Sequence, residues 1–576
     1  MIILSDVKNL YEKWLKFATK DKDVADELER INGDAVQINE RFYSDLEFGT
    51  GGLRGIIGAG TNRLNVYTVN RATQGLADYL NAKYENSSVA IAYDSRIKSD
   101  IFARSAAGVL AANGIKVYIY PELVPTPMLS FAVRYLKCKA GIMITASHNP
   151  AKYNGYKCYN EFGYQMTDEA AAETYDCIKK IDIFSDVKEI DFDNAVSHGK
   201  IEIIGSDVFN SFYEEVARQC SPEVCSSSDI RIIYSPLNGT GNKPVRHMLK
   251  TLGFKNVSVV PEQENPDGNF PTCPFPNPEI QQAFEYAIKL SEKENADLLI
   301  ATDPDCDRVG IAVNVGNNEF KLLNGNETGA LLCDYVLSRK KKDGTLLPGS
   351  YLVKTIVTSE LITKIGESYD CKTMNFLTGF KYIGEFVTKL EEQGEKDKYV
   401  LGMEESYGYL AGTHVRDKDA VVASALICEM AAYYKNQGKK LTDVLNDIFK
   451  KYGFYKNALL NFQFEGASGM EKMKALMEKM RSNAPDTIAS SNVVESLDYL
   501  SSRSVETASG IIKKIDLPRS NVLEYRLANG ATVVVRPSGT EPKIKIYVIA
   551  CGKTPAESDE IVESISTSMK TLLGLD

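Results

Sequence analysis

Residues 89–120, VAIAYDSRIKSDIFARSAAGVLAANGIKVYIY, hold a strand-like run, a helical run and a second strand-like run in succession. The outer runs, 89–93 and 116–120, are short and rich in Val, Ile and Tyr, which favours β-strands. The run between them, 101–112, is mostly apolar and spans roughly three helical turns. Alternation of this kind is typical of α/β layers, in which helices cover a sheet.

The same alternation recurs along the chain and then stops. A second series begins at 230–234, and a third runs from about 325 to 450. In the last 120 residues or so, Asn529-Gly530 separates two strand-like runs, which predicts a β-hairpin. Thr554-Pro555-Ala556-Glu557 then predicts a helix start with a capping box and Pro in its first turn. We therefore expect three α/β domains and a C-terminal α+β domain.

Two other stretches have weaker patterns. Residues 6–31 predict one amphipathic helix, with the single Trp, Trp14, on its buried face. Residues 482–509 are polar, with several Ser and Asn, and are expected to contain a loop.

Composition limits the classes of protein and partner. With 576 residues, of which 44% are hydrophobic and 25% charged, we expect a packed chain of three to five domains. The eleven Cys are scattered without CxxC pairs, which indicates reduced thiols in a cytoplasmic protein. The net charge of −10 argues against nucleic-acid binding, and no apolar run is long enough to suggest a membrane span or a signal peptide.

The hexapeptide Thr145-Ala146-Ser147-His148-Asn149-Pro150 follows the apolar run 141–144. The carboxyl end of a buried strand is where an α/β sheet presents catalytic groups, so Ser147 is a candidate catalytic residue. Lys157 comes soon afterwards and brings a cation to the same neighbourhood. Taken alone, the hexapeptide fits an ordinary turn better, because Ser and Asn cap helices and Pro ends strands.

Three carboxylates occupy alternate positions in Asp303-Pro304-Asp305-Cys306-Asp307-Arg308, directly after a strand-like run. Such carboxylates can converge on one hard cation. An EF-hand calcium loop is excluded, because its sixth position requires Gly and is Arg308 here, and its twelfth requires Glu and is Asn314. Three carboxylates are too few for an all-protein calcium site, and they suit Mg²⁺ with an outside ligand such as phosphate. The alternative is a solvated acidic turn.

Three further loops combine glycine with polar or charged residues. In 48–55, FGTGGLRG, backbone N–H groups and Arg54 can approach an anion. In 402–408, GMEESYG, Glu404 and Ser406 suit the recognition of sugar hydroxyls. In 536–542, RPSGTEP, an Arg, two hydroxyls and a glycine fit a phosphate group. A plain turn or a helix start is the alternative in each case.

The order of these loops resembles the α-D-phosphohexomutase superfamily. The motifs that carry the resemblance are FGTGGLRG (48–55), TASHNP (145–150), DPDCDR (303–308), GMEES (402–406) and RPSGTEP (536–542). They span nearly the whole chain, and the combination is far more specific than any one motif. The Glu-Glu-Ser form of the fourth motif and the length of the chain resemble the phosphoglucomutase branch.

The resemblance implies an α/β protein with four domains around a central cleft, three of them related α/β domains with mixed sheets and the last an α+β domain. We place the domains at 1–205 with the phosphoserine loop, 206–322 with the metal loop, 323–452 with the sugar loop and 453–576 with the phosphate loop.

The resemblance also implies a role for each motif residue. Ser147 would be the phosphoserine, and one oxygen of its phosphate would bind Mg²⁺ together with Asp303, Asp305 and Asp307. The remaining residues would surround the transferring group (Arg54, His148, Lys157, Arg308), bind the sugar (Thr378, Gly379, Lys381, Glu404, Ser406) and hold the phosphate that is not transferred (Arg536, Ser538, Gly539, Thr540). Some members of the superfamily have a His after the glycine of the Thr378-Gly379 segment. Because Phe380 stands there, no proton-transfer role is assigned to it.

The expected reaction is a phosphosugar mutase reaction. Lys157 is the candidate for removing the proton of the attacking sugar hydroxyl, with His148 as a possible helper, and glucose 1,6-bisphosphate would be both intermediate and activator. A small phosphosugar would be the only partner of a monomeric enzyme. Glucose phosphates are the expected substrates. A phosphopentomutase, a phosphomannomutase and a non-catalytic phosphosugar-binding protein are the alternatives, and the intact Ser147 and aspartates argue against the last.

Overall fold

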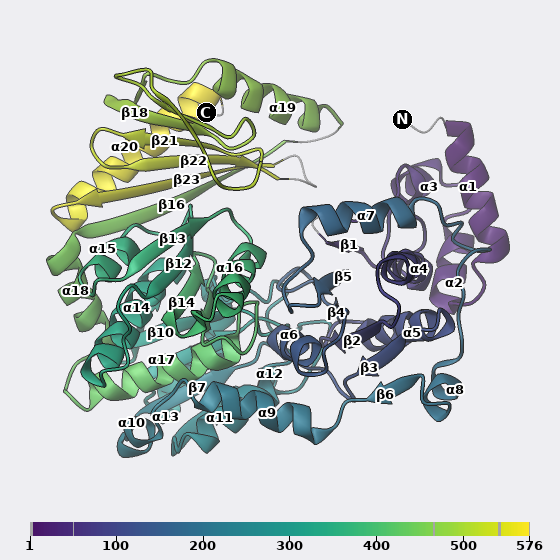
Figure 1. Cartoon of the computed structure of the whole chain (residues 1–576), viewed down its shortest axis with the longest axis horizontal. Helices are drawn as coiled ribbons and strands as arrows, with labels where there is room; N and C mark the ends of the chain where they lie inside the picture. Colours follow the sequence, from purple (N-terminus) through teal and green to yellow (C-terminus); the bar gives the residue numbers. More distant parts are fainter. Residues whose placement is uncertain (1–3, 50, 465–466, 539–542, 575–576) are drawn as a thin grey trace. The chain divides into compact units, whose positions relative to one another are not determined.

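The computed structural model describes residues 4–574, apart from residue 50 and segments 465–466 and 539–542. The chain separates into two compact units (Figure 1). The first unit comprises 1–324, 383–396 and 406–440, and the second comprises 325–382, 397–405 and 441–576. Among the described helices, none combines the length and the apolar character that a bilayer crossing requires.

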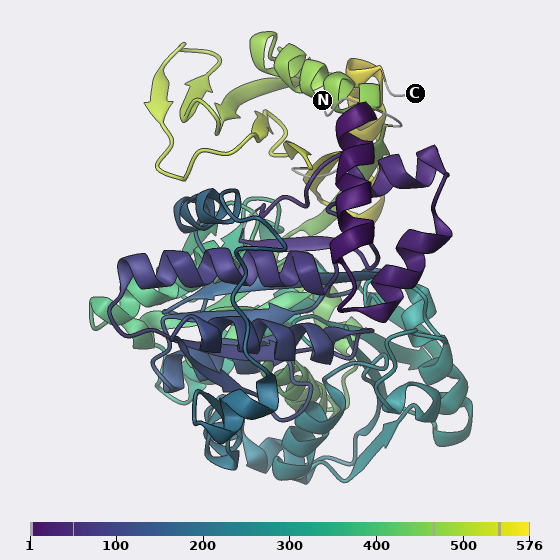
Figure 2. The ribbon, with the colours of Figure 1, turned by 90° about the vertical axis from the view of Figure 1, so that its right-hand side faces the viewer.

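Three short helices begin the first unit, α1 (Leu4–Phe17), α2 (Lys22–Arg30) and α3 (Ala35–Phe42). They lie together in the purple region of Figure 2. The prediction of one helix over 6–31 was wrong, because Asp21 caps a new helix by accepting a hydrogen bond from the Asp23 N–H at 3.0 Å. Trp14 is fully buried, and its ring meets the rings of Phe42, Tyr67 and Phe184 edge-on.

A mixed six-stranded sheet follows, in the order β1-β5-β4-β2-β3-β6. The strand β2, the helix α5 and the strand β3 form the strand–helix–strand succession that residues 89–120 predicted, and β2 pairs with β3 in parallel. The strands β1 and β5 form an antiparallel pair at one edge, and β5 also runs antiparallel to β4. The bounds of these strands are β1 (Gly52–Ile56), β2 (Ser88–Tyr93), β3 (Lys116–Ile119), β4 (Ala140–Ile144), β5 (Tyr153–Asn160) and β6 (Ile201–Ile203). The accompanying helices are α4 (Val66–Lys83), α5 (Ser99–Ala112), α6 (Thr126–Tyr135), α7 (Asp168–Ile178) and α8 (Phe192–Ser197).

The second sheet of this unit has the order β11-β10-β9-β7-β8. Like the first sheet, it has a parallel set of strands (β9, β7, β8) that antiparallel strands (β10, β11) extend at one edge. Its strands are β7 (Arg231–Ser235), β8 (Asn256–Val259), β9 (Leu298–Thr302), β10 (Val309–Gly316) and β11 (Glu319–Leu323). The helical segments are α9 (Ser206–Ala217), α10 (Pro222–Ser227), α11 (Asn242–Thr251), α12 (Pro261–Glu264), η1 (Gln281–Phe284) and α13 (Glu285–Glu294). The helix α17 (Ala420–Lys435) packs against α10, α11 and β9, and β15 (Gly408–Ala411) precedes it.

The second unit begins with a parallel arrangement in which β12 lies between β13 and β14. These strands are β12 (Tyr351–Thr355), β13 (Lys372–Phe376) and β14 (Tyr399–Glu404). The helical segments of this part of the chain are α14 (Gly325–Lys342), α15 (Leu361–Glu367), α16 (Phe380–Glu392), η2 (Lys396–Lys398) and α18 (Leu441–Tyr452).

The C-terminal sheet is antiparallel, in the order β16-β23-β22-β21-β18-β19-β20, with β17 beside β18. The predicted hairpin at Asn529-Gly530 is confirmed, because it joins β21 to β22. The polar stretch 482–509, which was predicted to contain a loop, has a turn at 499–502 and also contains three strands. The elements are β16 (Phe454–Gln463), α19 (Ala467–Ser482), β17 (Thr487–Ile488), β18 (Ser491–Asp498), β19 (Arg503–Glu506), β20 (Ile512–Lys514), β21 (Leu523–Leu527), β22 (Thr532–Pro537), β23 (Lys543–Gly552) and α20 (Pro555–Leu573).

Both faces of this C-terminal sheet are packed, which follows from the two-residue period of a strand. On β22, Val533 and Val535 lie in a core with residues of α19 and α20, among them Met473 and Met569. Val534 points to the other face and belongs to a core shared with Val357, Leu377, Tyr499 and Tyr547. The described helices and strands confirm the predicted combination of α/β layers and a C-terminal α+β part, while the four domain boundaries and the central cleft stay predictions.

Candidate active site

The Ser147 loop leaves the buried strand β4 and turns sharply. Ser147 is 4% exposed, and its backbone has a φ of +52°, in the left-handed region that disfavours residues other than glycine. Its N–H donates a hydrogen bond to Thr145 Oγ1 at 2.8 Å. Its hydroxyl donates to Asp303 Oδ2 at 2.9 Å, and Ser147 Oγ also lies 3.2 Å from His148 Nδ1. The proposed phosphate acceptor therefore contacts the proposed metal loop directly.

The three aspartates of the metal loop are buried together at the end of β9. Asp303 and Asp305 are fully buried, Asp307 is 2% exposed, and one carboxylate oxygen of each lies within 4.8 Å of the others. Asp303 Oδ1 accepts hydrogen bonds from the backbone N–H groups of Asp307 and Arg308, at 3.1 and 3.0 Å. The Oδ1 atoms of Asp305 and Asp307 are buried without a hydrogen-bond partner among the described residues.

Those two carboxylate oxygens provide a test of whether a cation fits the site. An unpaired buried carboxylate oxygen is costly, and the cost is removed when a hard cation takes that oxygen as a ligand. Three converging carboxylates and the neighbouring Ser147 oxygen are the donor set that a divalent cation prefers. The site therefore fits a divalent metal ion.

The charges of the aspartates are uneven. Burial raises the pKa of Asp303, and the nearby Asp305 carboxylate raises it further. Burial and the Asp305 carboxylate likewise raise the pKa of Asp307. Burial alone would also raise the pKa of Asp305, but the Lys157 ammonium, the hydrogen bond with Asp303 and the Lys418 ammonium together outweigh burial, so the pKa is lowered. Asp305 thus carries the most stable negative charge of the three.

Two lysines reach into this loop from different parts of the first unit. Lys157, on β5, places its Nζ 2.9 Å from Asp305 Oδ2. Lys418 places its Nζ 3.2 Å from Asp307 Oδ2. Lys418 was missed in the sequence, because a lysine within the charged run 416–419 gives no signal of burial. It precedes α17, whose N-cap is Asp419.

Thr126 is a second contact that the sequence did not reveal. It begins α6, its N–H donates to the Asp305 backbone carbonyl at 2.9 Å, and its Oγ1 donates to Asp305 Oδ2 at 3.1 Å. These bonds join two loops that lie 179 residues apart in the sequence. A threonine at a helix start is common, so its pattern alone could not indicate this contact.

Arg54 and Arg308 add positive charge to the site, and both charges act on His148. Arg308 Nη1 donates to Glu279 Oε1 at 2.8 Å, and Arg308 Nε lies 3.7 Å from Asp307 Oδ1. Arg54 lies on β1 opposite Gly155, which is two residues from Lys157 on β5. Burial lowers the pKa of His148 well below its usual range, and the charges of Arg308 and Arg54 act in the same direction. The same causes favour the neutral imidazole of His148 over its protonated form.

In the second unit, the two loops predicted to bind sugar touch one another. The Gly379 N–H donates to Glu404 Oε1 at 3.0 Å, and Glu404 and Lys381 are 7% and 8% exposed. Thr378 directly precedes Gly379 after β13. Glu404 ends β14, so the carboxyl ends of two strands bring these groups together.

The adjacent Glu405 is held by hydroxyls of the same unit. Thr355 Oγ1 donates to Glu405 Oε2 at 3.2 Å, and Thr355 and Thr358 share a hydrogen bond of 2.8 Å. Ser406, by contrast, belongs to the first unit, where the next residue accepts a hydrogen bond from the Val309 N–H at 3.1 Å. Along the chain, the division between the two units therefore falls within the Glu-Glu-Ser motif, between Glu405 and Ser406.

The phosphate loop is described in part. Arg536 lies on β22 opposite Lys545, and the Ser538 N–H donates to the Lys543 carbonyl at 2.7 Å. Arg536 also bonds the Tyr547 hydroxyl; burial raises the pKa of that tyrosine, and the charges of Glu405 and Glu404 add to the effect. Within the second unit, the Tyr547 hydroxyl thus lies between the charge of Arg536 and the charges of Glu404 and Glu405. Gly539 and Thr540 lie outside the described residues.

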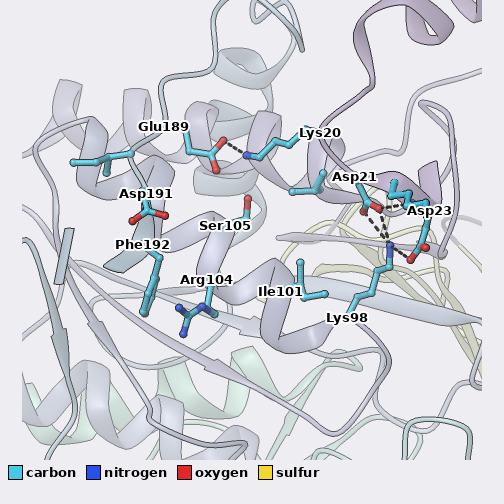
Figure 3. Close-up of a pocket in the computed structure, with 13 residues that line it drawn as sticks. Lys20, Asp21, Asp23, Lys98, Ile101, Arg104, Ser105, Glu189, Asp191 and Phe192 are labelled. Atoms are coloured by element: carbon cyan, nitrogen blue, oxygen red, sulfur yellow. Dashed lines mark hydrogen bonds and ion pairs between the residues drawn. The ribbon is translucent and has the colours of Figure 1, made fainter. Parts of the chain in front are cut away.

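A cavity of about 410 Å³ lies elsewhere in the first unit, among the N-terminal helices, α5 and α8 (Figure 3). Its cations have carboxylate partners. Lys98 contacts Asp21 and Asp23, and Lys20 contacts Glu189. None of the predicted site residues lines this cavity, so we do not assign it to the site.

Comparison with known proteins agrees with this arrangement. The phosphoglucomutase/phosphomannomutase family models match in succession, with α/β/α domain I at 45–183, domain II at 210–316, domain III at 324–452 and the C-terminal domain at 460–567. A phosphoglucomutase of Staphylococcus saprophyticus is 38% identical over 509 residues, covering 88% of this chain and 91% of the relative. A phosphoglucomutase of Staphylococcus aureus is 36% identical over 532 residues, covering 92% and 94%.

Solved structures share the fold at lower identity. A putative phosphomannomutase of Thermus thermophilus has a TM-score of 0.68 at 23% identity, covering 92% of this chain and 99% of the other. The pp63/parafusin phosphoglucomutase of Paramecium, in its open form, has a TM-score of 0.66 at 16% identity, covering 92% and 96%. With four family models matched in order and relatives above 30% identity over most of their length, the chain belongs to the phosphoglucomutase/phosphomannomutase family of the α-D-phosphohexomutase superfamily.

Proposed function

We propose that this chain is a phosphoglucomutase, which interconverts glucose 1-phosphate and glucose 6-phosphate through a phosphoserine at Ser147 and a glucose 1,6-bisphosphate intermediate. The observation that carries the proposal is the hydrogen bond from the buried Ser147 hydroxyl to Asp303, within a cluster of three buried carboxylates. A hydroxyl that is to carry a phosphate beside a metal ion needs this neighbourhood. The phosphoglucomutase relatives support glucose phosphates as the substrates.

Mg²⁺ is the cation that the three aspartates would hold, together with an oxygen of the Ser147 phosphate. When bound, Mg²⁺ neutralises charge on the phosphoryl group, which passes through a loose transition state. Lys157 and Lys418 supply further positive charge beside the aspartates. The residues of the chain otherwise act by positioning.

The reaction consists of two phosphoryl transfers, one from Ser147 to the sugar and one from the sugar back to Ser147. A sugar hydroxyl attacks the phosphorus on Ser147, its proton passes to the neutral His148 imidazole or to Lys157 in its neutral amine form, and the bond between phosphorus and Ser147 Oγ breaks. The glucose 1,6-bisphosphate then turns end for end, its other phosphate is attacked by Ser147 Oγ, and the serine recovers a phosphoryl group. The proton returns to the sugar oxygen that leaves. In the net reaction, the phosphate group of the glucose phosphate has moved between the sugar oxygens O1 and O6.

The other predicted residues bind the sugar. Glu404 would accept hydrogen bonds from ring hydroxyls of the sugar, and Ser406 would donate to them or accept from them. Thr378, Gly379 and Lys381 would also bind the sugar. Arg536, Ser538, Gly539 and Thr540 would hold the phosphate that is not being transferred. Arg54, His148 and Arg308 would surround the transferring group. A phosphomannomutase would use the same phosphoserine and metal loop. A comparison of kcat/KM for glucose 1-phosphate and mannose 1-phosphate therefore distinguishes a phosphoglucomutase from a phosphomannomutase.

Ser147→Ala should abolish mutase turnover and leave the fold intact, because it removes the oxygen that carries the phosphate. Incubation of the wild type with glucose 1,6-bisphosphate should add about 80 Da at Ser147 by peptide mass spectrometry, the mass of one phosphoryl group. The Ala variant should gain nothing. Full turnover by the Ala variant would rule out the covalent mechanism.

Asp305→Asn should weaken Mg²⁺ binding and lower turnover, because it removes the carboxylate with the most stable charge. Isothermal titration calorimetry with Mg²⁺ should show a higher Kd for the variant. Asp193→Asn is the matched control, since Asp193 is an exposed aspartate paired with Arg104, and its Kd should equal that of the wild type. Equal affinity in Asp305→Asn would place the metal elsewhere.

Arg536→Ala should weaken the binding of glucose 1-phosphate and of glucose 6-phosphate alike, because one phosphate loop serves both orientations of the sugar. The loss of a charge-assisted hydrogen bond to phosphate costs about 1.5–3 kcal/mol, so each Kd should rise by about 10- to 150-fold. Fluorescence or calorimetric titration of both ligands measures this. An effect on only one of the two would contradict a shared phosphate loop.

Glu404→Gln should lower kcat/KM for glucose 1-phosphate and narrow the preference for it over mannose 1-phosphate and ribose 1-phosphate. A site built on hydrogen bonds to sugar hydroxyls penalises an analogue that leaves a buried polar group unpaired. Phosphorylation of Ser147 should persist in the variant. An unchanged substrate ranking at unchanged rates would show that this loop does not select the sugar, and a wild type faster on mannose 1-phosphate would make the chain a phosphomannomutase.

A further inference from the structure

The Ser147 loop is held in place by an arginine that belongs to none of the five motifs. Arg96 follows β2 and is 3% exposed. Its Nη1 donates to the backbone carbonyls of Pro150 and Tyr153, at 3.1 and 3.0 Å. Its Nη2 donates to the carbonyls of Ser147, at 2.5 Å, and Asn149. One guanidinium thus accounts for four carbonyl oxygens of a single loop.

The guanidinium is itself fixed on its other sides. Arg96 Nε lies 3.4 Å from Asp94 Oδ2, and both side chains are fully buried. Asp94 Oδ1 accepts hydrogen bonds from the Arg96 N–H at 2.9 Å and from Ser99 Oγ at 2.8 Å. The Arg96 guanidinium carbon also lies 5.0 Å from the ring centroid of Phe270, which is fully buried. A planar guanidinium group held in this way cannot move with the loop, so it fixes the loop in one position.

The residues just after Arg96 are anchored by two sets of contacts. Asn154 Nδ2 on β5 donates to the Ile97 carbonyl at 3.1 Å and to Ser99 Oγ at 2.9 Å, which ties this segment to the strand that carries Lys157. Lys98 contacts Asp21 and Asp23 of the N-terminal helices (Figure 3). The segment that carries the guanidinium is therefore tied both to β5 and to the N-terminal helices.

The loop needs such a support because its conformation is unfavourable. A residue other than glycine in the left-handed region costs on the order of 1–3 kcal/mol and persists only where the surroundings impose it. Ser147 has a φ of +52°, and its own carbonyl is one of the four that Arg96 binds. Relaxation of this residue would swing its hydroxyl away from Asp303.

We propose that Arg96 is a positioning residue for phosphoryl transfer, which holds the strained Ser147 loop so that the serine oxygen stays aimed at the metal loop. The hydrogen bonds that Arg96 donates go to backbone oxygens of the Ser147 loop, so Arg96 acts through that loop. The inference rests on the proposed phosphoserine chemistry. It predicts that loss of the guanidinium slows the transfer step itself and leaves the affinity for the sugar unchanged.

The test compares Arg96→Lys and Arg96→Ala with wild type in rapid-quench experiments with ³²P-labelled glucose 1,6-bisphosphate. Displacement of a reacting group by about 1 Å can cost about 100-fold in rate, so Arg96→Ala should load and release phosphate at Ser147 about 100-fold more slowly. Arg96→Lys keeps the charge opposite Asp94 but has three donors on one atom, so its rate should fall by a smaller factor. KM for glucose 1-phosphate should stay near its wild-type value in both.

Two further readouts separate positioning from a general loss of stability. Hydrogen exchange should quicken in peptides covering 145–153 of both variants. The control Arg481→Ala removes a largely buried arginine of the second unit that donates to Asp498 and Asn521, and it should change thermal stability without changing the transfer rate.

The outcomes distinguish the inference from the proposed function. If the wild type takes no label at Ser147, the phosphoserine mechanism itself fails. If the wild type is labelled at Ser147 and Arg96→Lys, folded with a wild-type melting temperature, transfers phosphate at the wild-type rate, Arg96 has no positioning role. The proposal would also be wrong if Arg481→Ala, with the same loss of thermal stability as the Arg96 variants, slowed phosphoryl transfer as much as they do.

Discussion

The mutual repulsion of three buried carboxylates at 303, 305 and 307 is the constraint on which the rest of the site depends. Like charges this close and this far from water are unfavourable unless cations or hydrogen-bond donors compensate them. The chain supplies partial compensation through Lys157, Lys418 and the backbone N–H groups that bind Asp303. Two carboxylate oxygens still have no hydrogen-bond partner among the described residues, and this incomplete compensation is what makes the loop fit a cation.

The groups that compensate the carboxylates come from different parts of the fold. The site therefore forms only when these parts pack together. Lys157 comes from the antiparallel edge of the first sheet, Thr126 from the start of α6, and Lys418 from the loop before α17. The repeated sheet design places the Ser147 loop and the metal loop at the carboxyl ends of corresponding strands, β4 and β9. In the second unit, a sheet packed on both faces carries Arg536 and Tyr547, whose hydroxyl is affected by the charges of Glu404 and Glu405.

The sequence was informative where local patterns decide the structure. The strand–helix–strand run at 89–120, the hairpin at Asn529-Gly530 and the helix after Thr554 all appear as expected. It failed where one capping residue breaks a continuous pattern, as Asp21 does, and where polar residues form strands by pairing with distant partners, as in 482–509. The motifs named the residues of the site, and their roles stay proposals. Thr126, Lys418 and Arg96 were missed, because their importance lies in contacts over long sequence separations that no spacing reveals.

The central claim is that Ser147 and the three aspartates form one phosphoryl-transfer site around a divalent cation. Crystals of the protein phosphorylated with glucose 1,6-bisphosphate and soaked in Mn²⁺ allow a direct measurement by anomalous diffraction. The account predicts one strong anomalous peak, bound by a carboxylate oxygen each of Asp303, Asp305 and Asp307 and by a phosphate oxygen on Ser147. A phosphate on another residue, or a manganese ion bound away from these aspartates, would contradict it.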